Sequence, residues 1–419
     1  MSILIKNCLL NNKKTSIYIE DNIIKEIKPN IFVEAEHKID ATNKAAIPGL
    51  INAHTHAAMT LFRGYADDLE LHDWLQNYIW PLEAKLTYND LYWGTKLACI
   101  EMIKTGTTCF NDMYFFTRAV AKAVIEAGIR TFAGPVFIDL FDKERREAEI
   151  KRHSADLLAV KKLNHPRVIP VVNPHSVYSV SKEGLEWNRD FAKENDMMLH
   201  IHLAETEEEN KKSLELNKKR PVDYLEELKM LSPKLVAAHC VWLKKDEIIK
   251  LAKYDVKIAH NPVSNMKLAV GRALNYDEMK KAGLTVALGT DGCASNNNLD
   301  VFESMKFASL MQKFSFNKQT IMPDDEALKL ATLNGYKAFA LNGGVIEEGK
   351  LADLLLIDLN RIQFIPNHNL TSNIVYSANG NCVNTTICDG KILMQNRKVK
   401  DEEKIKEKAQ EVAYNLIRK

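Results

Sequence analysis

Two histidines separated by one residue, His54 and His56, stand at the end of a short apolar run in the sequence. Residues i and i+2 of a β-strand point to the same face, so both imidazoles can reach one metal ion. Neutral imidazole nitrogen is a good ligand for zinc and for iron. A chance pair of histidines at a turn explains the motif equally well. Other residues of the chain are therefore needed to distinguish a metal site from a turn.

Three further apolar runs end in residues that bind metals or transfer protons. They carry His200, His202 and Glu205 in the first, His239 in the second and Asp291 in the third. A lone histidine in such a place is usually a core residue with its hydrogen bonds satisfied. Four strand ends that all carry such residues are hard to explain by chance, so we predict a metal site.

Eight apolar segments alternate with helical patterns through the middle of the chain. This alternation indicates a parallel sheet covered on both faces, and eight units favour a (β/α)8 TIM barrel in the α/β class. Active sites of such barrels lie at the carboxyl ends of the strands. A doubly wound sheet is the alternative, but no G-x-G-x-x-G follows the first strand. The expected strands are 46–54, 107–113, 130–137, 168–173, 197–202, 235–239, 256–260 and 285–288.

Both ends of the chain carry strand and turn patterns instead, including an Asp389-Gly390 hairpin turn. We therefore expect residues 1–47 and 345–419 to form one small β-sandwich domain beside the barrel at 48–344. The last residues, 401–419, have the pattern of an amphipathic helix.

The composition is that of an ordinary globular protein, with 46% hydrophobic and 27% charged residues. A net charge of +2 gives no broad attraction to nucleic acid or to a membrane. There is no secretory leader pattern, and no apolar run approaches the ~20 residues of a membrane helix. The seven cysteines are scattered without a C-x-x-C motif, so we expect a cytoplasmic protein without disulfides.

Seven motifs spread over nearly the whole chain carry a family resemblance. The chain resembles the amidohydrolase superfamily and, within it, the 5′-methylthioadenosine/S-adenosylhomocysteine deaminases and their 5′-deoxyadenosine deaminase relatives. The motifs are PGLINAHTHAAMTLFRGYADDL (48–69), WPLE (80–83), NPHSVYSVS (173–181), HLAET (202–206), AHC (238–240), HNPVSNMKLAVG (260–271) and GTDGCASNNNLD (289–300).

The resemblance implies a metal ion held by His54, His56, His202 and Asp291. Relatives with two metals often bridge them with a modified lysine that ends strand four, and residues 168–173 contain no lysine. The resemblance therefore implies one divalent metal ion, zinc in the first place, with iron or manganese as alternatives.

The same resemblance assigns catalytic roles and contacts with the purine. Glu205 is the expected acid that protonates ring N1, and Asp291 is the expected base that takes a proton from the attacking water. His239 is expected to orient that water. A solvated loop glutamate is the alternative for Glu205.

Further residues match positions that bind the rest of the substrate. Glu83 is expected to hold the ribose hydroxyls, His175 to contact the substrate and Trp74 to pack near the nucleoside. Their structural alternatives are a helix-capping acid, a turn histidine and a core tryptophan. Arg145 or Arg146 is expected to bind a homocysteine carboxylate, with a solvated charge run as the alternative. If neither does, the preference shifts to compact 5′-substituents.

The predicted activity is the hydrolytic deamination of 5′-deoxyadenosine, 5′-methylthioadenosine, S-adenosylhomocysteine or adenosine to the matching inosines and ammonia. Alternatives within the fold are a deaminase of aminofutalosine or guanine and a triazine chlorohydrolase. A non-catalytic metal-binding scaffold would leave gaps in the catalytic set, and none is seen. Cytidine-type zinc deaminases are disfavoured because P-C-x-x-C is absent. We expect a small nucleoside as partner, no nucleic acid, no membrane and a homo-oligomer, either dimer or tetramer.

Overall fold

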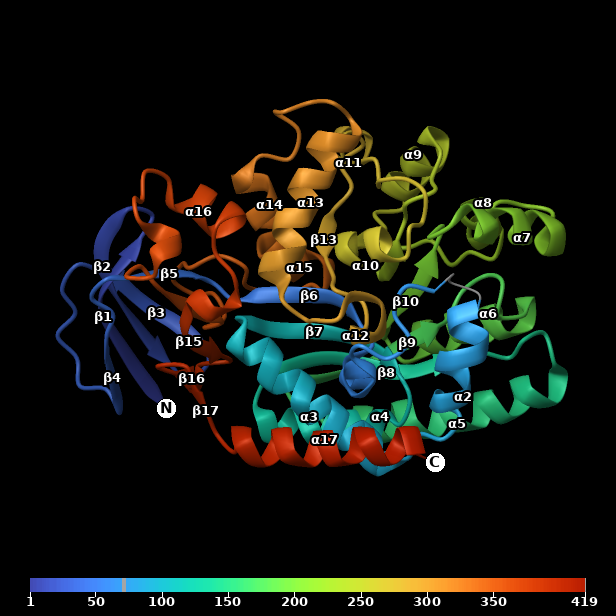
Figure 1. Ribbon diagram of the computed structural model, residues 1–419, viewed down its shortest axis with the longest axis horizontal. Helices are drawn as coiled ribbons and strands as arrows, with labels where there is room; N and C mark the ends of the chain where they lie inside the picture. The colour runs from blue at the N-terminus through green and yellow to red at the C-terminus, as the bar shows by residue number, and fades with distance from the viewer. Residues whose placement is uncertain (70–72, 419) are drawn as a thin grey trace.

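The computed structural model describes residues 1–69 and 73–418 and contains two β-sheets (Figure 1). The first sheet has nine strands drawn from both ends of the chain and lies at the left of the view. Strand β5 pairs antiparallel with β14, which joins the two ends. Its strands are β1 (Ser2–Leu10), β2 (Lys13–Glu20), β3 (Ile23–Lys28), β4 (His37–Asp40), β5 (Lys44–Pro48), β14 (Leu354–Asp358), β15 (Val383–Cys388), β16 (Lys391–Gln395) and β17 (Lys398–Val399).

The second sheet has eight strands in chain order, and every neighbouring pair is parallel. The N–H groups of Thr290 and Asp291 donate to the carbonyl oxygen of His54 at 3.2 and 3.0 Å, which joins the last strand to the first. The predicted (β/α)8 barrel is therefore confirmed. The strands are β6 (Leu50–Thr55), β7 (Thr107–Tyr114), β8 (Arg130–Phe137), β9 (Val168–Pro174), β10 (Met198–Leu203), β11 (Leu235–His239), β12 (Lys257–His260) and β13 (Val286–Leu288).

The predicted first strand at 46–54 is wrong, because the chain changes sheets at Gly49. Residues before it belong to β5 and residues after it to β6. A Cβ atom at Gly49 would lie 2.3 Å from Thr108 Oγ1, so only glycine lets the backbone pass this side chain. The domain limits at 47/48 and 344/345 stay a prediction.

Helices cover the outside of the barrel, and side chains that accept backbone N–H groups start several of them. Thr87 and Asp90 form a capping box at α3, and Ser181 and Thr206 cap α6 and α7. The helices are α3 (Tyr88–Lys104), α4 (Thr117–Ala127), α5 (Lys143–Lys162), α6 (Lys182–Glu194), α7 (Glu207–Asn217), α8 (Pro221–Glu227), α9 (Lys245–Lys253), α10 (Pro262–Lys267), α11 (Tyr276–Lys281), α12 (Cys293–Asn296), α13 (Val301–Ser315), α14 (Asp324–Ala331), α15 (Leu333–Ala338), α16 (Leu370–Tyr376) and α17 (Glu402–Arg418).

The predicted terminal helix is α17, which runs beside α3 along the lower edge of the view (Figure 1). It buries Ile405, Ala409, Val412 and Leu416, which recur at helical spacing. The last residue of the prediction, Lys419, lies outside the described residues.

Short helical segments follow the first barrel strand and lie at its carboxyl end. They are the 3-10 helix η1 (Ala57–Phe62), the π-helix η2 (Trp74–Ile79) and the single turn α2 (Trp80–Glu83). Two more 3-10 turns, η3 (Ile362–Phe364) and η4 (Gly380–Cys382), lie near the small sheet. π-helices are rare and often occur at functional sites, so η2 marks this end of the barrel for closer attention.

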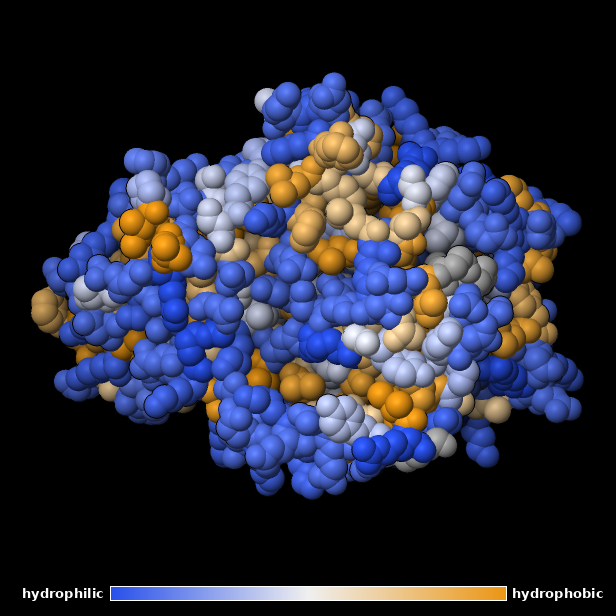
Figure 2. Space-filling model, viewed as in Figure 1, coloured by the Kyte–Doolittle hydropathy of each residue, from blue (hydrophilic) through white to orange (hydrophobic). Residues whose placement is uncertain are grey.

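Hydrophilic residues cover most of the molecular face in Figure 2, and apolar residues form separate patches on it. Within residues 1–69 and 73–418, no helix combines the length and the apolar character needed to cross a bilayer.

Candidate metal centre and active site

Four predicted metal ligands meet at the carboxyl ends of the barrel strands. The ring centroid of His54 lies 4.9 Å from those of both His56 and His202. Oδ1 of Asp291 lies 3.4 Å from His54 Nε2 and 3.3 Å from His56 Nε2. The ligand atoms of His54, His239 and Asp291 also lie within 4.8 Å of one another. His239 is therefore close enough to be considered as an alternative ligand.

The carboxylate of Asp291 is held from several sides. One oxygen accepts the N–H of Gly292 at 2.9 Å, and the other accepts the hydroxyl of Ser264 at 2.7 Å. The backbone of Asp291 is left-handed, with φ of 65°, which is strained for a residue with a Cβ. Its N–H bond to the His54 carbonyl keeps the strained residue next to the histidine pair.

The donor set fits a divalent metal ion. Nδ1 of His56 lies 2.5 Å from the Met113 carbonyl oxygen, and Nδ1 of His202 lies 2.9 Å from that of His175. A carbonyl oxygen only accepts, so each Nδ1 carries a hydrogen and Nε2 remains as the ligand atom. Nε2 of His54 is buried and has no hydrogen-bond partner among the described residues. Three imidazole nitrogens and one carboxylate oxygen are donor atoms that suit a divalent ion such as zinc.

The charges of this cluster also favour a cation. Burial lowers the pKa of His54 to about 4 and that of His202 well below its usual value. Burial acts in the same direction on His56, but the hydrogen bond and charge of Asp291 outweigh it and raise that pKa to about 9. Without a metal the cluster therefore keeps a proton between His56 and Asp291, which a binding metal ion must displace.

Glu205 follows β10 and lies in the cavity wall beside the cluster, with 17% of its side chain exposed, so it is not a solvated loop residue. Its Oε1 lies 3.6 Å from His239 Nδ1. Burial, together with the negative charge of Asp291, raises the pKa of Glu205 to about 8. The backbone there is held by Glu209, whose carboxylate accepts the N–H groups of Ala204 and Glu205 at 2.9 and 2.8 Å. These surroundings therefore favour the protonated form of Glu205.

His239 differs from the three predicted ligand histidines in its hydrogen bonds. The side-chain amides of Asn265 and Asn261 lie 2.9 and 3.4 Å from its Nδ1 and donate to it. Nδ1 is therefore an acceptor, and the hydrogen of the neutral ring is on Nε2. A nitrogen that carries a hydrogen donates a hydrogen bond and does not bind a metal.

The cluster opens into a cavity at the strand ends. Most of its wall is apolar or aromatic, and among the lining residues in the described ranges none is lysine or arginine. The wall is made by His56, Met59, Trp74, Leu75, Ile79, Trp80, Glu83, Met113, Tyr114, Phe115, Val136, Ile138, His175, Tyr178, His202, Glu205, His239, Leu268, Asp291 and Ser295.

Three predicted substrate contacts lie in this wall. Trp74 is 6% exposed, so it is both a largely buried side chain and a wall residue. Glu83 accepts the Tyr114 hydroxyl at 2.8 Å, and burial raises its pKa to about 7. Nδ1 of His175 pairs with the Ser179 hydroxyl at 2.7 Å, while its carbonyl holds His202.

The two predicted arginines are not brought into the wall. Arg145 donates from Nε to the Ile138 carbonyl at 3.1 Å, and Arg146 donates to the Ser181 hydroxyl at 3.3 Å. Arg146 also lies 3.7 Å from Glu183. Arg146 therefore bonds residues outside the cavity wall, whereas Arg145 is exposed and bonds the carbonyl of the wall residue Ile138.

Sequence reasoning missed the residues that orient the site. Tyr114 ends β7, so a wider search of strand ends would have found it. Ser264 and Asn265 lie in the HNPVSN motif, but nothing in their spacing shows that they face Asp291 and His239. Glu209 belongs to an acidic run that resembles a solvated helix start.

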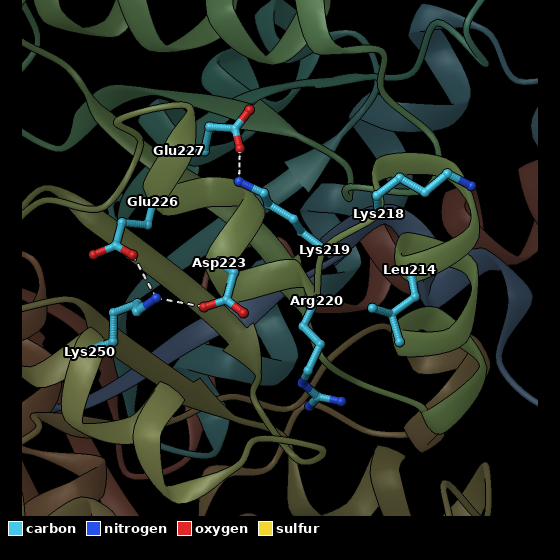
Figure 3. Close-up of a pocket in the computed structure, with 8 residues that line it drawn as sticks. All are labelled: Leu214, Lys218, Lys219, Arg220, Asp223, Glu226, Glu227 and Lys250. Carbon is cyan, nitrogen blue, oxygen red and sulfur yellow. Dashed lines mark hydrogen bonds and ion pairs between the residues drawn. The ribbon is translucent and has the colours of Figure 1, made fainter.

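A second hollow lies on the outer surface between α7, α8 and α9 (Figure 3). Several of its charged side chains pair with one another, and Arg220 pairs with Glu247 outside the hollow. Lys250 lies 2.6 Å from both Asp223 and Glu226, and Lys219 pairs with Glu227. Paired surface charges of this kind offer no reactive group, so the cavity at the strand ends is the candidate active site.

Comparisons with known proteins agree on the kind of molecule. A model described as the Amidohydrolase family matches residues 45–393. A 5′-deoxyadenosine deaminase of Methanoregula boonei is 48% identical over 100% of this chain and 96% of its own. A 5-methylthioadenosine/S-adenosylhomocysteine deaminase of Archaeoglobus fulgidus is 47% identical over 99% of both chains. An adenosine deaminase from Xanthomonas campestris, crystallised with zinc, superposes with a TM-score of 0.93 at 31% identity, covering 100% of this chain and 99% of its own.

Proposed function

Since the chain belongs to the amidohydrolase family, we propose that it deaminates 5′-substituted adenosines, adding water at purine C6 and releasing ammonia and the matching inosine. Relatives that are 48% and 47% identical over nearly their whole length carry the names of such deaminases. The observation that carries the proposal is the position of Glu205 in the wall of one cavity, beside a cluster of histidines and Asp291 that could hold a metal ion.

His54, His56, His202 and Asp291 would hold one divalent metal ion, and zinc is the first candidate. The three nitrogens and one oxygen support it, as does the zinc bound to the Xanthomonas campestris relative. Such an ion supplies a nucleophile at neutral pH, because it lowers the pKa of a coordinated water to about 7.

The protein's own groups move the protons. Asp291, whose pKa stays low because His54 and His56 outweigh the effect of burial, takes a proton from the attacking water. The water oxygen bonds to C6, and protonated Glu205 delivers its proton to ring N1. The C6–N6 bond then breaks as the proton held by Asp291 passes to the departing amine, so that ammonia leaves. The proton of the new C6 hydroxyl passes to the Glu205 carboxylate, which forms the C6 carbonyl of the inosine and restores the acid. His239 donates from Nε2 to the water oxygen and keeps it in line.

Glu83 supplies the selectivity for nucleosides. Above its pKa of about 7 it is a carboxylate, which accepts hydrogen bonds from two neighbouring hydroxyls. The ribose diol of a nucleoside offers this pair, whereas guanine or a triazine ring does not. Trp74 packs against the bound nucleoside, and His175 contacts it from the end of β9.

The 5′-group that fits best is small and uncharged. An ionised carboxylate that enters an apolar wall without a cation loses hydration and gains no partner. Neither Arg145 nor Arg146 lines the cavity, and the described wall contains no other basic side chain apart from histidines. 5′-Deoxyadenosine and 5′-methylthioadenosine are therefore better substrates than S-adenosylhomocysteine or a carboxylate-bearing nucleoside such as aminofutalosine.

A substrate panel tests the proposal. The metal-loaded protein is incubated with 5′-deoxyadenosine, 5′-methylthioadenosine, S-adenosylhomocysteine, adenosine, aminofutalosine, guanine and a chlorotriazine, and kcat/KM is measured for each. The two compact nucleosides should give the highest values. Faster turnover of guanine or the triazine would refute the nucleoside assignment, and faster turnover of S-adenosylhomocysteine would refute the preference for a compact group.

A further inference from the structure

His200 contacts the metal cluster without being one of its predicted ligands. It lies on β10 two residues before His202 and is fully buried. Its Nε2 lies 2.7 Å from Nδ1 of His54, and its Nδ1 lies 2.9 Å from the carbonyl oxygen of Val236 on β11. Two buried imidazoles and one carbonyl therefore form a continuous chain that ends at the cluster.

The carbonyl at one end fixes the hydrogens along this chain. Because a carbonyl oxygen only accepts, Nδ1 of His200 must donate to Val236. In neutral His200 the other nitrogen, Nε2, has no hydrogen and accepts. A charged His200 would be a buried cation whose hydrogen-bond partners in the described part of the chain are an imidazole and a carbonyl, which is costly. Nδ1 of His54 is therefore the donor.

This assignment decides whether His54 can bind a metal. With its hydrogen on Nδ1, His54 has a lone pair on Nε2. This atom lies 3.4 Å from Asp291 and has no hydrogen-bond partner in the described part of the chain. In the other tautomer an N–H would occupy that place, and the ring could not act as a ligand. We propose that His200 is a positioning residue that selects the metal-binding tautomer of His54, an inference that rests on the metal site proposed above.

His54 is the one predicted ligand histidine whose tautomer depends on a side chain. The Nδ1 atoms of His56 and His202 donate to backbone carbonyls, which no substitution at those partners removes. Hydrogen-bond partners of this kind change metal affinity by about 10- to 100-fold when they are lost. A substitution at His200 is therefore expected to weaken metal binding while both other histidines remain oriented.

Two amide variants separate this role from simple packing. The amide of glutamine reaches the place of Nε2 and can accept from His54, whereas that of asparagine reaches only the place of Nδ1. Zinc affinity is measured by competition with a chromophoric chelator. His200→Gln should stay within about 3-fold of the original protein, while His200→Asn and His200→Phe should lose about 10- to 100-fold.

His153→Phe is the matched control. His153 is a fully buried histidine of α5 that bonds the Glu149 carbonyl at 2.8 Å and lies outside the cavity wall. Its replacement should leave zinc affinity unchanged, and circular dichroism of the metal-free proteins checks folding.

Other results would refute either the role of His200 or the metal site itself. Equal zinc affinity of the Asn and Gln variants, or equal failure of both to fold, would overturn the tautomer role of His200. If the Phe variant does not fold, the difference in zinc affinity between the Asn and Gln variants still tests the role of His200. Absence of zinc binding in the unmodified protein would instead refute the metal site and the proposed function.

Discussion

Replacing Glu205 by glutamine is expected to lower kcat by ~10²- to 10⁴-fold, the usual contribution of a positioned general acid. Glutamine has nearly the same shape but no proton to give to ring N1. With a pKa of about 8, roughly nine-tenths of Glu205 is protonated at pH 7, whereas well under about 1% of an ordinary glutamate would be. The loss should fall on kcat, because the substitution leaves the metal ligands and the cavity wall in place.

The activity should fall on the alkaline side of the pH profile, because Glu205 acts in its protonated form. As pH rises through about 8, Glu205 loses its proton, so kcat/KM of the unmodified protein should fall about tenfold per pH unit. The residual activity of Glu205→Gln should lack this alkaline limb. Initial rates of ammonia release between pH 6 and pH 10, with metal content measured on the same samples, provide the test.

Glu207→Gln is the matched control, because Glu207 starts α7 on the surface and pairs there with Lys211 at 3.1 Å. It should keep full activity and the alkaline limb. If Glu205→Gln retains bound metal and turns over within about 3-fold of the unmodified protein, the assignment of Glu205 as the acid is refuted.

Three further expectations concern the substrate, the metal and the fold. Glu83→Gln should raise KM for ribonucleosides by about 10- to 150-fold, since it removes a charged hydrogen bond worth ~1.5–3 kcal/mol, and an unchanged KM would exclude contact with the ribose. Removing the metal with a chelator should abolish turnover and lower Tm, and added zinc should restore both. A ligand present at 1,000 times its Kd stabilises the folded protein by about 4 kcal/mol. An unchanged Tm would argue against a metal at the cluster. Gly49→Ala should destabilise the protein by about 1–3 kcal/mol in urea unfolding, because its Cβ meets Thr108 Oγ1 at 2.3 Å, and a change below about 0.5 kcal/mol would contradict the close passage.

The barrel and the cluster of predicted ligands followed from the sequence because strand ends of a parallel barrel converge. Once His54, His202 and Asp291 are placed at the ends of apolar strands, the topology brings them together. Their roles and that of Glu205 remain proposals. That these three residues lie close together could be predicted without knowing the loop conformations.

Features that depend on contacts between residues far apart in the sequence could not be predicted. The tautomers of His56 and His202 depend on carbonyls of Met113 and His175, which belong to neighbouring strand ends. The sheet change at Gly49 depends on the Thr108 side chain of β7.

The positions of long, flexible side chains could not be predicted from the sequence either. The charge run that contains Arg145 and Arg146 matched a substrate-binding region, but both residues lie in the first turn of α5, where Arg145 bonds the Ile138 carbonyl and Arg146 bonds Ser181. The homo-oligomer and the cytoplasmic location stay predictions.

The origin of the product oxygen tests the central claim most directly. The zinc-loaded protein is incubated with 5′-deoxyadenosine in water enriched in oxygen-18, and the purine product and ammonia are quantified by mass spectrometry and by an enzymatic assay. Hydrolytic deamination predicts 5′-deoxyinosine with one labelled oxygen and one equivalent of ammonia. Unchanged 5′-deoxyadenosine, or cleavage to free adenine without ammonia, would contradict it.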